Sequence, residues 1–163
     1  MSDKNMNELV GIYKEVLANG DFQITYQYLV SIIQNVRTLF SKEYKGIYSV
    51  SGILHGYIDV TYFYLQNELL KKNKLKLAVV LNHQNANFEI WLVAQTKDIQ
   101  ISYWKKMENE KWVDSQNMPQ YSIFETTLLE NPDFNNKSNL LDTVYKSYES
   151  LSSEIFEVLE DYV

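Results

Sequence analysis

Near the start of the chain, apolar residues recur every three or four positions, the pattern of a helix with one buried face. Asn19-Gly20 ends this helix, and Asp21 is a suitable N-cap for a second one. The first stripe, within 7–18, consists of Leu9, Ile12, Tyr13, Val16 and Leu17. The second consists of Phe22, Tyr26, Leu29, Val30, Ile33, Val36 and Phe40. The pattern therefore predicts two consecutive helices.

The middle of the chain is rich in β-branched and aromatic residues, which favour strands. Thr96 can cap a helix that follows them, and Asn131-Pro132-Asp133 ends the last strand. The predicted elements are strands at Tyr57–Leu65, Lys74–His83 and Phe88–Gln95, a hairpin turn at Gln84–Asn87, a helix at Lys97–Met107, a strand at Tyr121–Leu129 and a helix at 138–162.

The resulting order is α-α-β-β-β-α-β-α, in which the β-like stretch 47–65 counts as one strand. This order favours the α+β class, with an antiparallel sheet of about four to five strands and helices packed mainly on one face. The length of 163 residues suits a single domain over 1–163.

The last predicted helix has a heptad-like seam. Its members are Leu141, Val144, Tyr148, Leu151, Ile155, Val158 and Tyr162. Packing on the chain's own second helix is favoured, because the run covers only about three heptads. A homodimer through residues 138–162 is the alternative.

The hairpin has two different faces. If His83 faces Phe88, one face is wholly apolar and should meet the helices, whereas the other pairs Asn82 with Glu89 and Val80 with Trp91. We call this other side of the sheet the second face.

The strand Tyr57–Leu65 is expected beside Lys74–His83, with Ile58, Val60, Tyr62 and Tyr64 towards the helices. Asp59 would then lie opposite Asn82 on the second face, in a row with Glu89. Mixed polar and aromatic surfaces of this kind are candidate binding sites. The predicted binding residues are Tyr57, Asp59, Thr61, Asn82, Glu89 and Trp91.

Composition narrows the function classes. The chain has no cysteine, which excludes disulfides, a thiolate nucleophile and cysteine-ligated metals. The N-terminus is polar, and no apolar run approaches the roughly 20 residues that span a bilayer. A cytoplasmic protein without membrane contact is therefore expected.

The formal net charge is −6, so the protein has no general electrostatic attraction for nucleic acid. One local basic group, made of Lys71, Lys72, Lys74 and Lys76, could bind phosphate. A solvated turn is the favoured interpretation of that group.

Two carboxylates on neighbouring strands of a sheet could bind Mg²⁺, or could act as the general acid and the general base of a catalytic site. Asp59 and Glu89 would fill the acidic positions of a restriction-endonuclease-like site. The lysine of the expected Glu-x-Lys is absent, because the sequence reads Glu89-Ile90-Trp91. His83 alone is a weak metal signal, and no phosphate-binding loop or serine-nucleophile motif is present. No cofactor and no metal site are predicted.

The chain resembles a bacterial protein family, the domain of unknown function 7000 family, from about residue 10 to 160. The residues that carry the resemblance are Tyr13-Lys14-Glu15, Gly20, Gln23, Tyr26, Leu29, Arg37, Phe40, Ser51-Gly52, Gly56–Phe63, Leu75–Val80, Asn82-His83, Phe88–Leu92, Ile99-Gln100, Tyr103-Trp104 and Asn131–Phe134. One departure is Ile58-Asp59-Val60, where the family pattern has Met-Asp-Met. The resemblance implies a stand-alone cytosolic bacterial protein and transfers no catalytic residue.

These observations favour a non-enzymatic domain that binds a small molecule or a protein through the second face. The alternative is a metal-dependent hydrolase or nuclease with Asp59 and Glu89 as carboxylate ligands.

Overall fold

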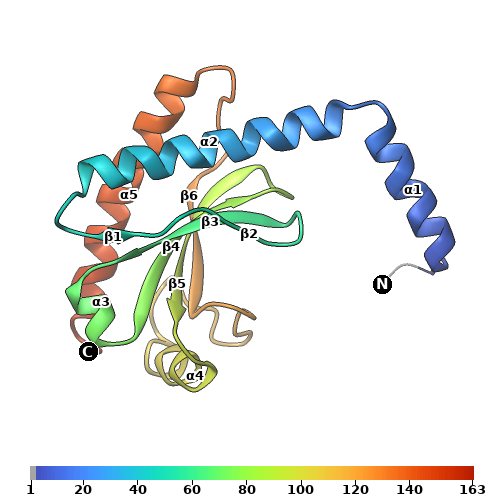
Figure 1. Cartoon of the computed structure of the whole chain (residues 1–163). Coiled ribbons are helices and arrows are strands. Elements are labelled where there is room, and N and C mark those ends of the chain that lie inside the picture. Colours follow the sequence, from blue (N-terminus) through green and yellow to red (C-terminus); the bar gives the residue numbers. More distant parts are fainter. Residues whose placement is uncertain (1–2) are drawn as a thin grey trace. The chain divides into compact units, whose positions relative to one another are not determined.

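A computed structural model describes residues 3–163 of the chain (Figure 1). The helices are α1 (Met6–Ala18), α2 (Asp21–Glu43), α3 (Glu68–Lys72), α4 (Lys97–Lys106) and α5 (Lys137–Leu159). The strands are β1 (Ser49–Val50), β2 (Leu54–His55), β3 (Val60–Gln66), β4 (Leu75–Asn82), β5 (Asn87–Ala94) and β6 (Phe124–Leu129). The predicted α+β class is confirmed; α3 was not predicted.

The chain divides into two compact units, and the boundary between Ile32 and Ile33 falls inside α2. In the first unit, Asn5 and Glu8 form a reciprocal capping box that starts α1. Gly20 has φ +80°, a conformation that glycine adopts at little cost, and it separates the two helices. The predicted single domain over 1–163 stays a prediction.

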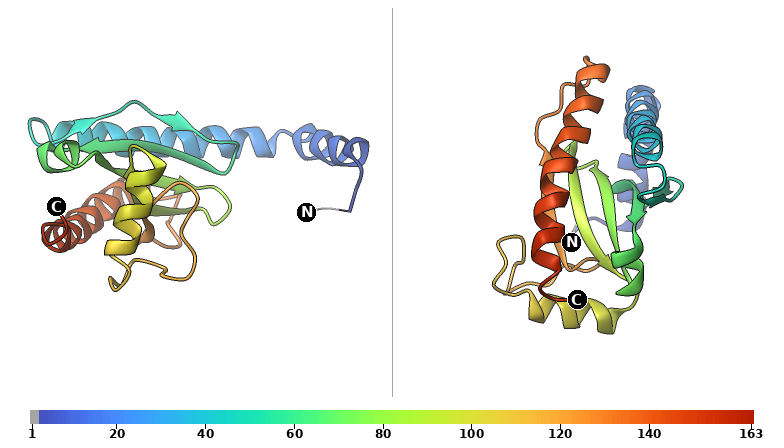
Figure 2. Two further views of the ribbon diagram at one scale, coloured as in Figure 1. Left: turned by 90° about the horizontal axis from the view of Figure 1, so that it is seen from below. Right: turned by 90° about the vertical axis from the view of Figure 1, so that its left-hand side faces the viewer.

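The second unit contains a sheet with the strand order β1-β3-β4-β5-β6, in which β2 also pairs with β3. All pairs are antiparallel. Figure 2 shows α5 running along one side of the sheet and α4 beyond one of its ends. The sheet therefore has one face covered by helices and a second face on the opposite side.

The covered face is made of fully buried apolar side chains. Phe63, Val79 and Ile90 form one row across β3, β4 and β5, and each is 0% exposed. The ring of Phe40 on α2 lies 5.7 Å from that of Phe63 and 5.0 Å from that of Tyr148 on α5. Phe40 thus joins the sheet to both helices.

The buried stripe of α5 differs in part from the predicted seam. It consists of Leu140, Val144, Tyr148, Ser152, Ile155 and Leu159. Leu141, Leu151, Val158 and Tyr162 are only half-buried. Because Tyr148 contacts Phe40, packing against the chain's own second helix is confirmed, while a homodimer through 138–162 stays a prediction.

The β4–β5 pairing is displaced by two residues from the predicted register. Asn82 faces Asn87, and the turn occupies 83–86. Oδ1 of Asn82 accepts hydrogen bonds from the backbone N–H groups of Gln84 and Asn85. These bonds start the turn directly after Asn82, one residue before its predicted start. A shift of two keeps every side chain on its predicted face.

The β3–β4 register differs from the prediction by one residue, and this exchanges the faces of β3. Val60, not Asp59, faces Asn82. The residues towards the helices are Thr61, Phe63 and Leu65, all 0% exposed, while Val60, Tyr62 and Tyr64 lie on the second face. Tyrosine keeps its hydroxyl group near water there, whereas phenylalanine and leucine have nothing polar to leave exposed.

Alkaline pH should destabilise the fold through its buried phenols. Burial raises the pKa of Tyr148 and raises that of Tyr64 to about 12. Above pH ~10 the unfolded chain releases protons that the folded chain keeps, so stability is complete below that pH and falls as the pH rises towards 12. A fully protected phenol contributes about 1.4 kcal/mol per pH unit.

Chemical denaturation at a series of alkaline pH values would measure this slope. Tyr148→Phe should reduce it, and Tyr13→Phe, at a tyrosine that is 58% exposed, provides the matched control. A slope that Tyr148→Phe leaves unchanged would contradict the assignment.

Candidate functional site

The second face contains a hollow of about 490 Å³ with aromatic walls and a small floor. Tyr64, Ala78 and Trp91 lie opposite one another in a row across three strands. Because Ala78 has only a methyl group, the row dips at its centre between two aromatic side chains. Tyr62 and Tyr121 also line this space, which we call the aromatic hollow.

The side chain of Trp91 is held by a hydrogen bond to Glu89, which is itself bonded to Asn82. Its Nε1 donates to Oε1 of Glu89 at 2.9 Å, and Nδ2 of Asn82 donates to Oε2 of the same carboxylate at 3.2 Å. Glu89 is only 8% exposed. A buried carboxylate with both oxygens bonded positions its donors rigidly. Three of the predicted residues therefore form one unit, with Trp91 towards the hollow.

Asp59 lies in the turn before β3, at the rim of the aromatic hollow. Its Oδ1 accepts hydrogen bonds from the N–H groups of Tyr57 and Val60 at 2.7 and 2.8 Å. A Cβ atom on Gly56 would lie 2.3 Å from the same oxygen, so a larger residue there would displace the carboxylate from these hydrogen bonds. Asp59 therefore organises the turn, and its predicted place in a row opposite Asn82 is wrong.

Tyr57 and Thr61 are placed on different sides of the sheet. Tyr57 is 97% exposed at the rim of the aromatic hollow, whereas Thr61 is fully buried on the covered side. Oγ1 of Thr61 is hydrogen-bonded to Nε2 of His83 at 2.8 Å. Burial lowers the pKa of His83, and the nearby charge of Asp59 opposes this shift. The predicted position of Thr61 on the second face is wrong because β3 is shifted by one residue.

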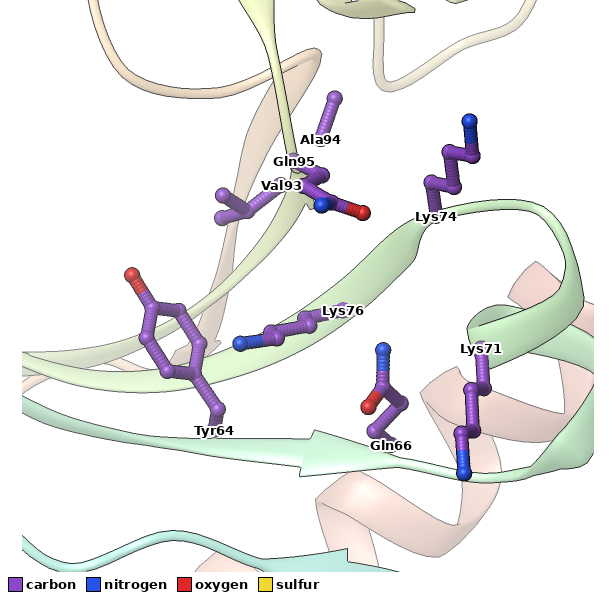
Figure 3. Close-up of a pocket in the computed structure, with 8 residues that line it drawn as sticks. All are labelled: Tyr64, Gln66, Lys71, Lys74, Lys76, Val93, Ala94 and Gln95. Carbon is purple, nitrogen blue, oxygen red and sulfur yellow. The ribbon is translucent and has the colours of Figure 1, made fainter.

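A second hollow, of about 440 Å³, is lined by Lys71, Lys74 and Lys76 together with Tyr64, Gln66, Val93, Ala94 and Gln95 (Figure 3). We call it the lysine hollow. Three of the four lysines in the predicted basic group thus line one cavity. Nζ of Lys76 lies 4.8 Å from the ring centre of Tyr64, within the range of a cation–π contact.

The two carboxylates that the hydrolase alternative requires, those of Asp59 and Glu89, accept hydrogen bonds from different donors. Asp59 accepts from backbone N–H groups, and Glu89 accepts from Trp91 and Asn82. Among residues 3–163, no three or more His, Asp or Glu side chains are grouped so as to hold a metal ion. The arrangement gives both carboxylates structural roles in shaping the aromatic hollow.

Several residues of the site were not predicted. Tyr62 and Tyr64 are predicted on the covered face but lie on the second face, and Ala78 is outside the set of predicted binding residues. The alternation of Tyr62, Phe63, Tyr64 and Leu65 contained the signal, because phenols and purely apolar side chains fall on opposite faces. Tyr121 lies in a loop, and the local sequence does not predict its contact with the hollow.

Backbone strain at the rim leads to a further prediction. Ile58 has φ +66°, a conformation that costs a β-branched residue about 1–2 kcal/mol. Ile58→Gly should therefore raise the free energy of unfolding by about 1 kcal/mol, even after the greater chain entropy of glycine. Chemical denaturation measures this change.

Ile47→Gly is the matched control, because Ile47 is also exposed, at 61%, and is outside the set of positive-φ residues. It should cost up to about 1 kcal/mol. Equal losses in both variants would show that Ile58 is not strained.

Comparison with protein families matches residues 6–159 to the family described as Domain of unknown function (DUF7000). No curated protein and no solved structure matches the chain. Within residues 3–163, the helices include none that is long and apolar enough to cross a membrane.

Proposed function

The chain belongs to this domain-of-unknown-function family, and we propose from the geometry of the second face that it is a non-enzymatic domain. It would bind a small molecule in the aromatic hollow. The observation that carries the proposal is the row Tyr64, Ala78 and Trp91, in which a small residue separates two aromatic walls. Such a gap accepts a flat apolar group between ring faces.

Size and rigidity support a small ligand. The volume of about 490 Å³ falls within the range of roughly 300–1,000 Å³ that is typical of ligand sites. The hydrogen bond that Trp91 donates to Glu89 holds the indole in place before a ligand arrives, which reduces the entropy lost on binding. A protein partner would need about 800 Å² of surface on each side and would gain little from a narrow concave site.

The enzymatic alternative has no observation that favours it over binding. It required Asp59 and Glu89 to share a coordination sphere, and each is bonded by its own donors. A bacterial origin and a cytoplasmic location stay predictions.

The proposal can be tested by screening small aromatic compounds with heteronuclear NMR. The indole N–H signal of Trp91, identified by its loss in Trp91→Phe, should shift on binding. Ala78→Leu would fill the floor of the hollow and should weaken binding by more than tenfold, at a cost of about 1–3 kcal/mol in stability.

Ala18→Leu adds the same volume to an exposed residue of α1 and should leave binding unchanged. Should Ala78→Leu fail to fold, Trp91→Phe provides the second variant, with an expected loss of severalfold. The proposal fails if no compound shifts the Trp91 signal, or if compounds bind equally well to wild type and to the filled variant.

A further inference from the structure

The two hollows are neighbours on the same face of the sheet. Tyr64 and Val93 line both of them. Along β4, Ala78 forms the floor of the aromatic hollow and Lys76 lines the lysine hollow, two residues further back. Residues two apart on a strand point to the same side and are separated by about 7 Å. One small molecule can therefore reach from one hollow into the other.

The backbone that carries the lysines is held by hydrogen bonds. Oδ1 of Asn67 accepts from the N–H of Leu70, whose fully buried side chain anchors the short helix α3. Nε2 of Gln66 donates to the carbonyl of Leu75 at 2.9 Å, and the carbonyl of Lys74 accepts from the N–H of Gln95 at 2.9 Å. The three lysines thus extend from a fixed frame.

Lys74 itself has a strained backbone, with φ +58°. Strained non-glycine residues of this kind are enriched at ligand sites, where a side chain is needed at a position that glycine would otherwise occupy. A glycine here would remove the strain but also the ammonium group from the rim of the hollow. The presence of lysine in place of glycine at this strained position therefore favours a role for its ammonium group.

The three lysine side chains line the hollow but point in different directions. In Figure 3, the ammonium group of Lys76 lies beside Tyr64, whereas those of Lys71 and Lys74 extend in opposite directions at the other side of the hollow. Lys76 therefore has an aromatic contact, and the other two lysines can turn inward through their flexible side chains. Ammonium groups of this kind suit phosphate or carboxylate oxygens.

Charge on this face is distributed unevenly. No carboxylate lines the lysine hollow, and the ion pairs found among residues 3–163, Lys111–Glu154 and Lys146–Asp142, lie elsewhere. Asp59 is at the rim of the aromatic hollow, and Glu89 is hydrogen-bonded to Trp91. An anionic group would be repelled from that end and attracted to the lysines.

We propose that the lysine hollow holds the anionic group, a phosphate or a carboxylate, of a ligand whose flat apolar part lies in the aromatic hollow. This inference rests on the proposed function and specifies the class of ligand and its orientation. The phosphate would lie between Lys74 and Lys76, and the ring system between Tyr64 and Trp91.

Three probes test the assignment: naphthol, naphthyl phosphate and naphthoate, each titrated by NMR at fixed ionic strength. Naphthyl phosphate should bind the wild type about tenfold more tightly than naphthol, since each exposed ammonium adds a modest attraction. Lys74→Gln/Lys76→Gln should abolish most of this preference, so that naphthyl phosphate and naphthol bind the double variant with nearly equal affinity. A similar gain for naphthoate would indicate a carboxylate as an equally suitable group.

The matched control is Lys105→Gln/Lys106→Gln on α4. It makes the same change in net charge, and Lys106 has a comparable contact with an aromatic ring, 5.2 Å from the ring centre of Tyr103. This control should retain the tenfold preference. If both double variants lost the preference to the same extent, the preference would come from the overall charge of the protein, and the inference would be overturned.

The inference also fails if naphthol and naphthyl phosphate bind the wild type equally. In that case a shifted Trp91 signal would leave the proposed function intact. A Trp91 signal that no aromatic compound shifts is the separate failure of the proposed function itself.

Discussion

Phe40→Ala should lower the free energy of unfolding by about 3–5 kcal/mol, the range for removing a large buried aromatic side chain. Phe40 is 0% exposed and contacts rings on β3 and α5. Its loss would leave a cavity where the sheet meets both helices, because the surrounding rings can close the space only in part. Chemical denaturation with a two-state fit measures the change.

Phe22→Ala is the matched control on the same helix. Phe22 is 36% exposed, so the same substitution removes much less buried surface and should cost less than half as much. Similar costs at the two positions would show that Phe40 is not a central contact of the core.

Glu89→Gln should cost about 1–3 kcal/mol, although it changes almost no volume. Both oxygens of Glu89 accept hydrogen bonds, from Nε1 of Trp91 and from Nδ2 of Asn82. A glutamine has only one oxygen, so its amide NH₂ group must face one of these donors. Asn82 cannot adapt by turning its amide, because its Oδ1 already accepts from Gln84 and Asn85.

The effect of Glu89→Gln should be visible at Trp91 as well as in stability. The indole N–H signal should shift, and compounds that bind in the aromatic hollow should bind severalfold more weakly. Thermal unfolding and NMR titration together measure the two consequences. Unchanged stability would mean that the carboxylate is not needed as a double acceptor.

Glu125→Gln provides the control on the neighbouring strand. Glu125 faces Trp91 across the β5–β6 pair and accepts one hydrogen bond, at 3.0 Å, from the hydroxyl group of Ser122. A serine hydroxyl can donate or accept, so a glutamine can keep this bond. The cost should stay within about 0.5 kcal/mol, as for most surface substitutions.

Periodicity predicted the four longer helices, the hairpin and the class of the fold because those features are local. The faces of β4 and β5 were also predicted correctly, since a two-residue shift at the turn preserves them. The faces of β3 were reversed, because the apolar residues Ile58 and Val60 favoured one assignment, whereas the alternation of phenols and apolar side chains from Tyr62 to Leu65 indicated the other, which is the one observed.

The candidate site was predicted only in part for the same reason. Asn82, Glu89 and Trp91 come together because they belong to one hairpin. The walls formed by Tyr62 and Tyr64 depend on the register of β3, and the wall formed by Tyr121 depends on a distant loop. The lysine hollow depends on α3, where the cap of Asn67 and the buried Leu70 create a helix too short to show a period.

The residues of β3 alternate between the core and the hollow. Substitutions on this strand should therefore have different consequences from insertions or deletions. Point substitutions at Tyr62 or Tyr64 can alter what the hollow accepts while Phe63 and Leu65 keep the core intact. Insertion or deletion of a single residue would exchange the two sets at once and damage both stability and recognition. New specificities should therefore arise on this strand through substitutions, while changes in length accumulate in the loops.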